Sequence, residues 1–332
     1  MALDPRTALP SQPLAEPLRV GFFGTPALAV PTLDALLAHP DLCTVVAVVA
    51  QPDKPAGRGN KLRSPPTAVR AKELGLPLLQ PRKVRSGAFP EAIDALNLDV
   101  AVVIAYGRIL TTRLLESPRY GCINVHASLL PAWRGAGPIQ WSLAHGDAVT
   151  GVTTMWMEEG LDTGPMLLVQ EEPIADDDTA ASLGTRLGDL GAALAVRTLQ
   201  ELAAGRLTAT AQPGEGVSHA PLLSKEDGRI DWSRPARLVS AHARGMTPWP
   251  GATCCYRGAV LKVKGIELAE GEGTPGAVLT ADKSGIVVAC GEGSVRLTVV
   301  QPAGKRALPV ADFLNGYSVQ AGESLAFSTA AD

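Results

Sequence analysis

The chain has 332 residues, of which 46% are hydrophobic and 19% are charged, so it can bury the cores of two domains. Its net charge of -3 does not indicate general nucleic-acid binding, and any basic surface must be local. The five cysteines are scattered without metal-site spacing, which is typical of reduced thiols in a cytoplasmic protein. No apolar run is long enough to suggest a membrane span.

The beginning of the chain differs from the rest in composition. Residues 1–17 contain four prolines and no continuous apolar run, so they do not read as a signal peptide. We expect this stretch to be a disordered extension and the folded part to begin at Leu18.

From Leu18 onward, short apolar segments alternate with helical patterns. The strands predicted in this part lie at residues 18–23, 45–50, 77–80, 99–106, 122–126 and 151–157. A helix ending near His39 follows the first strand. This alternation predicts a Rossmann-like α/β domain with a mostly parallel sheet, which binds ligands beyond the carboxyl ends of its strands.

The first turn of this domain carries Gly21 and Gly24 but lacks the G-x-G-x-x-G pattern of a dinucleotide site. A simple strand-to-helix turn is therefore the favoured interpretation.

Residues 51–66 form a segment rich in proline and glycine, for which we expect no regular element. Basic residues outnumber the single acidic residue, Glu73, between Lys54 and Arg85. Such a run is commonly just a solvated connection. Alternatively, it supplies phosphate contacts that position a nucleic acid without reading its sequence.

The second half of the chain changes in character after a long helix. A leucine stripe predicts this helix over residues 178–205, and residues 206–223 have the polar texture of an interdomain linker. Residues 224–332 contain short strand candidates at 253–256, 259–263, 276–279, 286–289 and 295–299, which predict a small OB-like β-barrel. Trp232 and Trp249 are interpreted as core anchors of that domain rather than stacking platforms.

The strongest chemical pattern lies at the end of the strand at residues 122–126. Asn124 and His126 alternate with apolar residues, so both side chains project from one face of the strand. Asp162 follows in the glycine-flanked segment at 160–164. An amide and an imidazole can stabilise an oxyanion, and a carboxylate can orient the imidazole and move a proton.

Each of these residues also has a structural alternative. Asn124 could cap a turn, His126 could be a buried core histidine, and Asp162 could close an Asx-turn. No serine or cysteine has the setting of a nucleophile elbow, and no histidine pair has metal spacing. The set therefore suggests direct acyl transfer to an external nucleophile.

The central sequence N-V-H-A-S-L-L-P-A-W-R-G-A-G-P-I-Q, followed by G-L-D-T-G, resembles the folate-dependent formyltransferases. The resemblance runs from about Arg19 nearly to the C-terminus. Further support comes from G-T-P at 24–26, Q-P-D-K-P-A-G-R-G at 51–59, A-Y-G at 105–107, L-S-K-E at 223–226, I-D-W at 230–232, P-W-P at 248–250 and Q-P-A-G-K at 301–305.

This resemblance implies that 10-formyltetrahydrofolate donates a formyl group to the α-amine of methionine esterified to initiator tRNA. The family's catalytic residues correspond to Asn124, His126 and Asp162. Its folate-associated segment corresponds to Ser128, Leu129, Leu130 and Pro131, and residues 105–107 fall at the expected pterin pocket.

The resemblance also implies where tRNA binds. The basic loop matches the insertion that meets the tRNA acceptor end, and its candidate contacts are Lys54, Arg58, Lys61 and Arg63. The C-terminal barrel matches a second tRNA-contacting domain. No metal or nicotinamide cofactor is implied, and a cytoplasmic monomer is expected.

Two positions depart from the usual family pattern, and several competing functions remain open. Ala127 replaces a common glycine, which requires a negative φ there, and Ala132 replaces a common basic residue. A formyltransferase acting on a sugar nucleotide or small amine, or a formyltetrahydrofolate hydrolase, would share the catalytic residues. A nicotinamide-dependent oxidoreductase or a non-enzymatic RNA-binding module would explain only parts of the chain.

Overall fold

The computed structural model describes residues 9–56 and 61–327, so Arg58 lies outside the described residues. The chain divides into two compact units. The first comprises Met1–Pro138, Val149–Pro173 and Gly184–Pro221, and the second comprises Ile139–Ala148, Ile174–Leu183 and Leu222–Asp332.

The first unit is built on a seven-stranded sheet with strand order β10-β9-β7-β6-β1-β2-β5. Its strands are β1 (Leu18–Gly24), β2 (Cys43–Val49), β5 (Leu78–Leu79), β6 (Val100–Ile104), β7 (Cys122–His126), β9 (Val149–Trp156) and β10 (Met166–Pro173). The strands from β5 to β7 are parallel, whereas β9 and β10 run antiparallel to their neighbours. The predicted mostly parallel α/β sheet is confirmed, although the sequence did not reveal β10.

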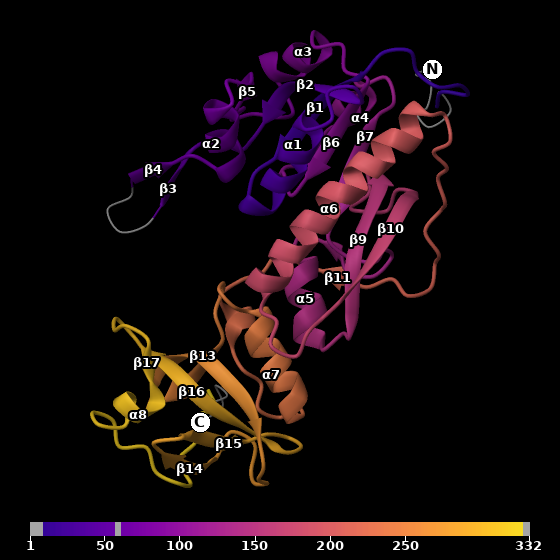
Figure 1. Ribbon diagram of the computed structural model, residues 1–332. Helices are drawn as coiled ribbons and strands as arrows, with labels where there is room; N and C mark the ends of the chain where they lie inside the picture. The colour runs from indigo at the N-terminus through magenta and orange to yellow at the C-terminus, as the bar shows by residue number, and fades with distance from the viewer. Residues whose placement is uncertain (1–8, 57–60, 328–332) are drawn as a thin grey trace. The chain divides into compact units, whose positions relative to one another are not determined.

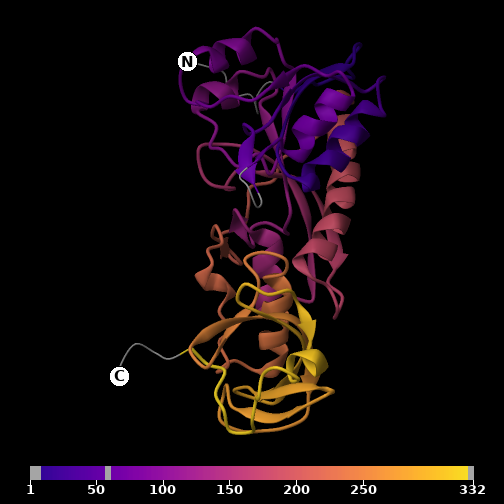
Figure 2. The same ribbon diagram turned by 90° about the vertical axis from the view of Figure 1, so that its left-hand side faces the viewer.

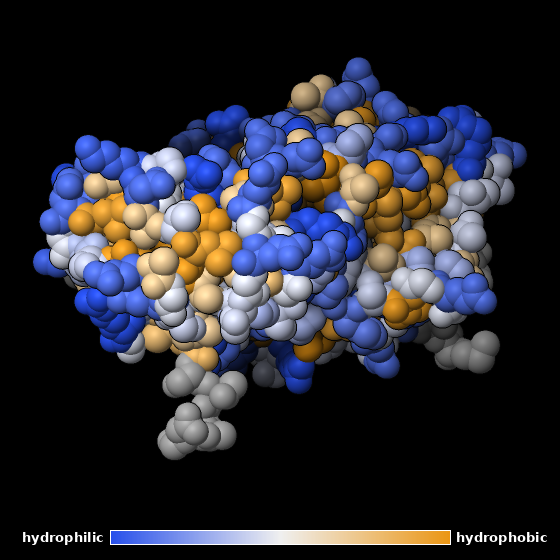
Figure 3. Space-filling model, turned by 90° about the horizontal axis from the view of Figure 1, so that it is seen from below, coloured by the Kyte–Doolittle hydropathy of each residue, from blue (hydrophilic) through white to orange (hydrophobic). Residues whose placement is uncertain are grey.

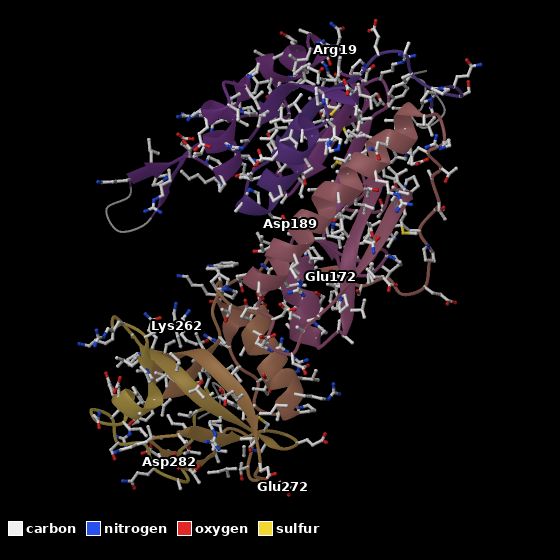
Figure 4. All side chains as sticks on the ribbon, in the orientation of Figure 1. Arg19, Glu172, Asp189, Lys262, Glu272 and Asp282 are labelled. Atoms are coloured by element: carbon white, nitrogen blue, oxygen red, sulfur yellow. The ribbon has the colours of Figure 1, made fainter. Side chains whose placement is uncertain are left out.

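Helices cover both faces of this sheet (Figure 1). They are η2 (Ala27–Ala29), α1 (Val30–Leu37), α2 (Pro66–Glu73), α3 (Ala88–Asp94), α4 (Thr112–Glu116) and α6 (Ala180–Ala203). The predicted long helix is confirmed as α6. It packs closely on the sheet because Gly191 carries no side chain, and an added Cβ would lie 3.0 Å from Val125. Arg186 of α6 also pairs with Glu172 of β10 at 2.6 Å. Figure 4 labels Glu172 on this strand.

The basic segment contains a β-hairpin, so the expectation of no regular element there is wrong. Strand β3 (Lys54–Ala56) pairs antiparallel with β4 (Lys61–Arg63). Among the described residues the pair forms a separate two-stranded sheet, and Pro55 is tolerated because an edge strand need not donate every ladder hydrogen bond. Figure 1 shows this hairpin projecting away from the main sheet.

Two segments without long elements nevertheless have defined contacts in the first unit. In the N-terminal extension, for which composition predicts disorder, the amide of Leu14 donates to the carbonyl of Ala203 at 2.8 Å. In the segment interpreted as a linker, β11 (His219–Ala220) pairs in parallel with β8 (Arg134–Gly135). The linker segment is therefore bound along the first unit.

The second unit contains a curved antiparallel sheet with strand order β12-β13-β16-β15-β14, and β17 pairs with β16 (Figure 2). These strands are β12 (Thr253–Tyr256), β13 (Ala259–Ala269), β14 (Val278–Asp282), β15 (Gly285–Ala289), β16 (Ser294–Pro302) and β17 (Leu308–Pro309). The accompanying helices are α5 (Pro138–His145), η3 (Glu226–Gly228), α7 (Ala236–Gly245) and α8 (Val310–Phe313). The predicted small β domain is confirmed as an antiparallel half-barrel.

The two tryptophans interpreted as core anchors have different environments. Trp232 is 3% exposed and donates its indole N–H to the carbonyl of Leu325, as expected of an anchor. Trp249 is 51% exposed, so its assignment to the core is wrong. Its neighbour Pro250 is buried instead. The P-W-P pattern alone does not indicate which of its three residues enters the core.

Polar and apolar residues are interleaved on the face shown in Figure 3. Within residues 9–56 and 61–327, no helix is both long and apolar enough to cross a membrane.

Burial of His242 on α7 makes the second unit sensitive to acid. Desolvation, assisted by the positive charge of Arg234, lowers the pKa of His242 from 6.5 to about 4. The Nε2 atom is buried and has no hydrogen-bond partner among the described residues. The unfolded chain therefore binds a proton at higher pH than the folded chain, so stability is retained above pH 6.5 and falls as the pH decreases toward 4.

We expect His242→Leu to weaken this acid sensitivity. Between pH 7 and pH 4.5, the parent should lose about 2 to 3 kcal/mol more unfolding free energy than the variant, measured by urea titration. His39→Leu is the control because His39 is exposed. An equal loss in the parent and in His242→Leu would contradict the assignment.

Candidate active site

Strand β7 brings Asn124 and His126 to one face of the sheet. The strand lies between β6 and β9, where Asn124 is opposite Val103 and Met155. His126, the last residue of β7, is only 5% exposed. Asn124 and His126 therefore share one face of the strand, as its alternation predicts, and lie partly buried at the carboxyl edge of the parallel strands.

The carboxylate of Asp162 joins these two side chains. Its Oδ1 accepts from Asn124 Nδ2 at 3.3 Å, and its Oδ2 accepts from the backbone amide of Gly135 at 2.8 Å. His126 Nδ1 lies 3.7 Å from Oδ2. Asp162 has a φ of 52°, a left-handed conformation that aspartate adopts more readily than most residues. The three predicted catalytic residues are thus together in space.

The other imidazole nitrogen of His126 has a defined partner. Nε2 lies 3.0 Å from the carbonyl oxygen of Trp133. A carbonyl can only accept, so this hydrogen bond requires a proton on Nε2. The other ring nitrogen, Nδ1, is the one that faces Asp162.

The segment after β7, which contains the predicted folate residues, is held by internal hydrogen bonds. Ser128 is fully buried, and its hydroxyl donates to the carbonyl of Ala132 at 2.6 Å. Thr153 donates to the carbonyl of Ser128 and accepts from the amide of Leu130. The Ser128 and Leu130 side chains shape the segment from inside, whereas Leu129 and Pro131 keep partly exposed surfaces.

The A-Y-G turn at residues 105–107 follows β6, next to β7. Its backbone is fixed by side chains from two other sequence motifs: Thr25 and Gln51 both donate to the carbonyl of Tyr106. Gln51 also donates to the carbonyl of Gly107, and a Cβ on that glycine would lie 2.4 Å from Gln51 Nε2. The G-T-P and Q-P-D motifs, remote from the turn in sequence, therefore act together in fixing its backbone.

Burial lowers the reactivity of two side chains: Tyr106, after the carboxyl end of β6, and Cys122, at the amino end of β7. Burial raises the pKa of Tyr106 to about 12, and the ring packs edge-on against Phe23. Burial also raises the pKa of Cys122 to about 12, so its thiol is not a ready nucleophile. Within the part of the chain that the structure describes, no His, Cys, Asp or Glu cluster could hold a metal ion.

Sequence reasoning missed Gln212, which lies in the segment assigned as a linker. Its amide donates to the carbonyls of Asp162 and Gly164, each at 2.8 Å, and accepts from the guanidinium of Arg134. Ser218 in the same segment accepts from the amide of Trp133. An isolated glutamine in a polar, proline-containing stretch gives no sequence signal for such contacts.

The predicted tRNA-binding residues do not have equal environments. Lys54 donates to Gln51 Oε1 at 2.6 Å, so its ammonium group already has a partner at the base of the hairpin. Lys61 and Arg63 are exposed on β4, beside Leu62, which is 70% exposed.

The two departures from the family pattern leave the local backbone intact. Ala127 is not in the left-handed region, so its Cβ causes no conformational strain. Ala132 contributes its carbonyl to the Ser128 hydrogen bond, a role that does not depend on the side chain.

Comparison with known proteins identifies the family to which this fold belongs. Residues 18–199 match the formyl transferase family, and residues 222–318 match the formyl transferase C-terminal domain. The chain therefore belongs to the formyl transferase family.

Relatives with nearly half of their residues identical to this chain define a narrower group within the family. Methionyl-tRNA formyltransferase from Citrifermentans bemidjiense is 49% identical over 305 residues, covering 92% of this chain and 95% of that protein. The corresponding protein from Sorangium cellulosum is 48% identical over 309 residues, covering 92% of this chain and 98% of that protein. Within the family, the chain groups with the methionyl-tRNA formyltransferases, which excludes the oxidoreductase and non-enzymatic alternatives.

Solved structures with low sequence identity share the fold. HypX from Aquifex aeolicus, in complex with tetrahydrofolic acid, has a TM-score of 0.59 at 17% identity, covering 90% of this chain and 47% of that chain. The present chain thus spans about half the length of HypX. The sugar 3N-formyl transferase WlaRD, in the presence of dTDP and 5-N-formyl-THF, has a TM-score of 0.63 at 15% identity, covering 87% and 99% of the two chains.

Proposed function

We propose that this protein transfers the formyl group of 10-formyltetrahydrofolate to the α-amine of methionine esterified to initiator tRNA. The main observation behind the proposal is that Asn124, His126 and Asp162 lie in contact at the carboxyl edge of the sheet. The near-half identity to methionyl-tRNA formyltransferases over most of the chain supports the acceptor. The folate species in two structures of the same fold support the donor class.

In the proposed mechanism, the neutral amine of the acceptor attacks the formyl carbon directly. The carbonyl oxygen then becomes an oxyanion, for which Asn124 offers the Nδ2 hydrogen that Asp162 does not use. His126, when protonated, offers Nδ1–H, because Nε2–H is directed to Trp133. Preorganised donors of this kind stabilise charge that develops only during the reaction.

Asp162 supplies the proton path in this proposal. The attacking amine loses a proton as the new C–N bond forms, and the departing folate nitrogen gains one as the old C–N bond breaks. The carboxylate lies beside both Asn124 and His126, so it can accept the first proton directly or through water and return it. No covalent enzyme intermediate is required.

We propose that the folate donor lies against two segments at this edge. The A-Y-G turn at 105–107 offers a rigid backbone beside β7 rather than charged groups, which fits a neutral pterin ring. Ser128 and Leu130 support the second segment from inside, whereas Leu129 and Pro131 have surface available for contact.

For the whole chain, we propose an extension at 1–17, a catalytic domain at 18–205, a linker at 206–223 and a tRNA-contacting domain at 224–332. The basic hairpin would meet the acceptor end of the tRNA, where Lys61 and Arg63 are exposed cations of β4. We further propose a monomeric cytoplasmic enzyme.

The decisive experiment follows labelled formyl from 10-formyltetrahydrofolate. Charged initiator tRNA, charged elongator tRNA, free methionine and an amino sugar nucleotide are compared as acceptors, and formate release is measured in parallel. We expect label mainly on methionyl initiator tRNA. Label mainly on the sugar, or release as formate, would reject the tRNA assignment in favour of a sugar formyltransferase or a hydrolase.

The Asn124→Ala substitution should lower kcat in this assay by about a hundred- to a thousandfold, because one oxyanion donor is lost. Donor affinity should be largely retained, which 5-formyltetrahydrofolate binding can measure. Gln200→Ala is the matched control because it removes an exposed side-chain amide on α6, outside the proposed tRNA-contacting domain. A change confined to the Michaelis constant would contradict the proposed role.

Replacing Lys61 and Arg63 together by alanine should weaken use of tRNA while leaving kcat at saturation nearly unchanged. Each lost phosphate contact should reduce the slope of log affinity against log salt by about one. Arg197→Ala, an exposed change on α6, provides the control. An unchanged slope in the double variant would remove the hairpin from the tRNA-binding surface.

A further inference from the structure

We propose that Gln212 is a positioning residue that holds Asp162 in its catalytic orientation. This inference rests on the proposed function of Asp162, but its geometry is independent of the acceptor. Gln212 Nε2 donates to the backbone carbonyls of Asp162 and Gly164, each at 2.8 Å. Its Oε1 accepts from Arg134 Nε at 2.9 Å and from Nη2 at 2.7 Å.

These four hydrogen bonds use both N–H groups and both lone pairs of the Gln212 amide. They also determine how the amide is oriented. A flipped amide would direct its oxygen at two carbonyls and its N–H groups at a guanidinium, which cannot accept. Gln212 therefore has one satisfied orientation, and two of its bonds fix the backbone of the loop that carries Asp162.

That loop needs support because its backbone conformation is uncommon. Asp162 has a φ of 52°, and left-handed backbone at a non-glycine residue is intrinsically unfavourable. At Gly164, an added Cβ would lie 1.9 Å from the carbonyl oxygen of Trp156, so the loop is pressed against the end of β9. The hydrogen bonds from Gln212 to the carbonyls of residues 162 and 164 bracket the turn and hold it in this conformation.

The same glutamine also reaches the opposite side of the site. Its partner Arg134 lies between Trp133, whose carbonyl binds His126, and Gly135, whose amide binds Asp162. Gln212 is therefore connected to the groups that orient both the imidazole and the carboxylate. No described contact joins it to the reacting side-chain atoms themselves, so its effect must pass through Asp162 and its neighbours.

The flanking residues hold Gln212 in place across both loops. On one side, Thr210 exchanges two backbone hydrogen bonds with Met166, each at 2.8 Å. On the other side, Ser218 bonds to the amides of Trp133 and Arg134. The segment from 210 to 220 thus acts as a brace across the site rather than as a free spacer.

The test compares two substitutions that separate the two halves of the Gln212 amide. Gln212→Met is similar in length and removes all four hydrogen bonds. Gln212→Glu keeps an acceptor for Arg134 but places acceptor oxygens against the carbonyls of Asp162 and Gly164. Gln170→Met is the matched control, because Gln170 is exposed on the neighbouring strand β10.

We expect kcat at saturating substrates to fall about ten- to a hundredfold in both Gln212 variants, since small displacements of a reacting group have effects of this size. The Michaelis constant for the donor should stay close to that of the parent. Counting folded sites by 5-formyltetrahydrofolate binding separates this effect from misfolding. A parental kcat in Gln212→Met, or in Gln212→Glu, would overturn the positioning role.

A second readout does not depend on the proposed reaction. Amide hydrogen exchange of residues 160–164 should be faster in Gln212→Met than in Gln170→Met, and unchanged exchange would overturn the inference. A parent that fails to formylate methionyl-tRNA would instead refute the proposed function, leaving the exchange result to decide the role of Gln212.

Discussion

The carboxylate of Asp162 is the group on which the arrangement of this site depends. It accepts hydrogen bonds from a strand side chain, Asn124, and from a loop amide, Gly135, and it lies beside His126. A carboxylate that is 13% exposed needs such donors, because burial without hydrogen bonds would destabilise its charge. The same bonds that satisfy the charge therefore fix the relative positions of an amide, an imidazole and a carboxylate.

Segments that are remote from the catalytic strand in sequence hold the backbone around this site in place. Gln212 and Ser218 stabilise the loops on either side of Asp162, and Thr25 and Gln51 stabilise the turn after β6. The result is a site in which most polar side chains are occupied in holding backbone. The proposed acyl transfer requires this rigidity, because oxyanion donors that must reorganise lose much of their effect.

The side chains of the charged hairpin are exposed, unlike those of the candidate active site. Lys61 and Arg63 are exposed on a two-stranded ribbon, where a cation contributes little to folding stability but is accessible to a phosphate. Lys54 differs because its ammonium is bonded to Gln51, which links the base of the hairpin to the turn after β6. A net charge of -3 for the whole chain is compatible with this local concentration of positive charge.

The sequence by itself determined the parallel core strands, the long helix, the β-rich C-terminal domain and the placement of Asn124 and His126 on one strand face. These features follow from periodicity and alternation, which are local properties of the sequence. The sequence also singled out Asp162 in its glycine-flanked segment, and the resemblance assigned a catalytic role to all three residues. Only the tertiary structure revealed β10, the basic hairpin, the exposure of Trp249 and the hydrogen bonds of Gln212. Edge strands and hydrogen bonds between residues 50 positions apart depend on which segments meet in space, and that information is not present in any local pattern.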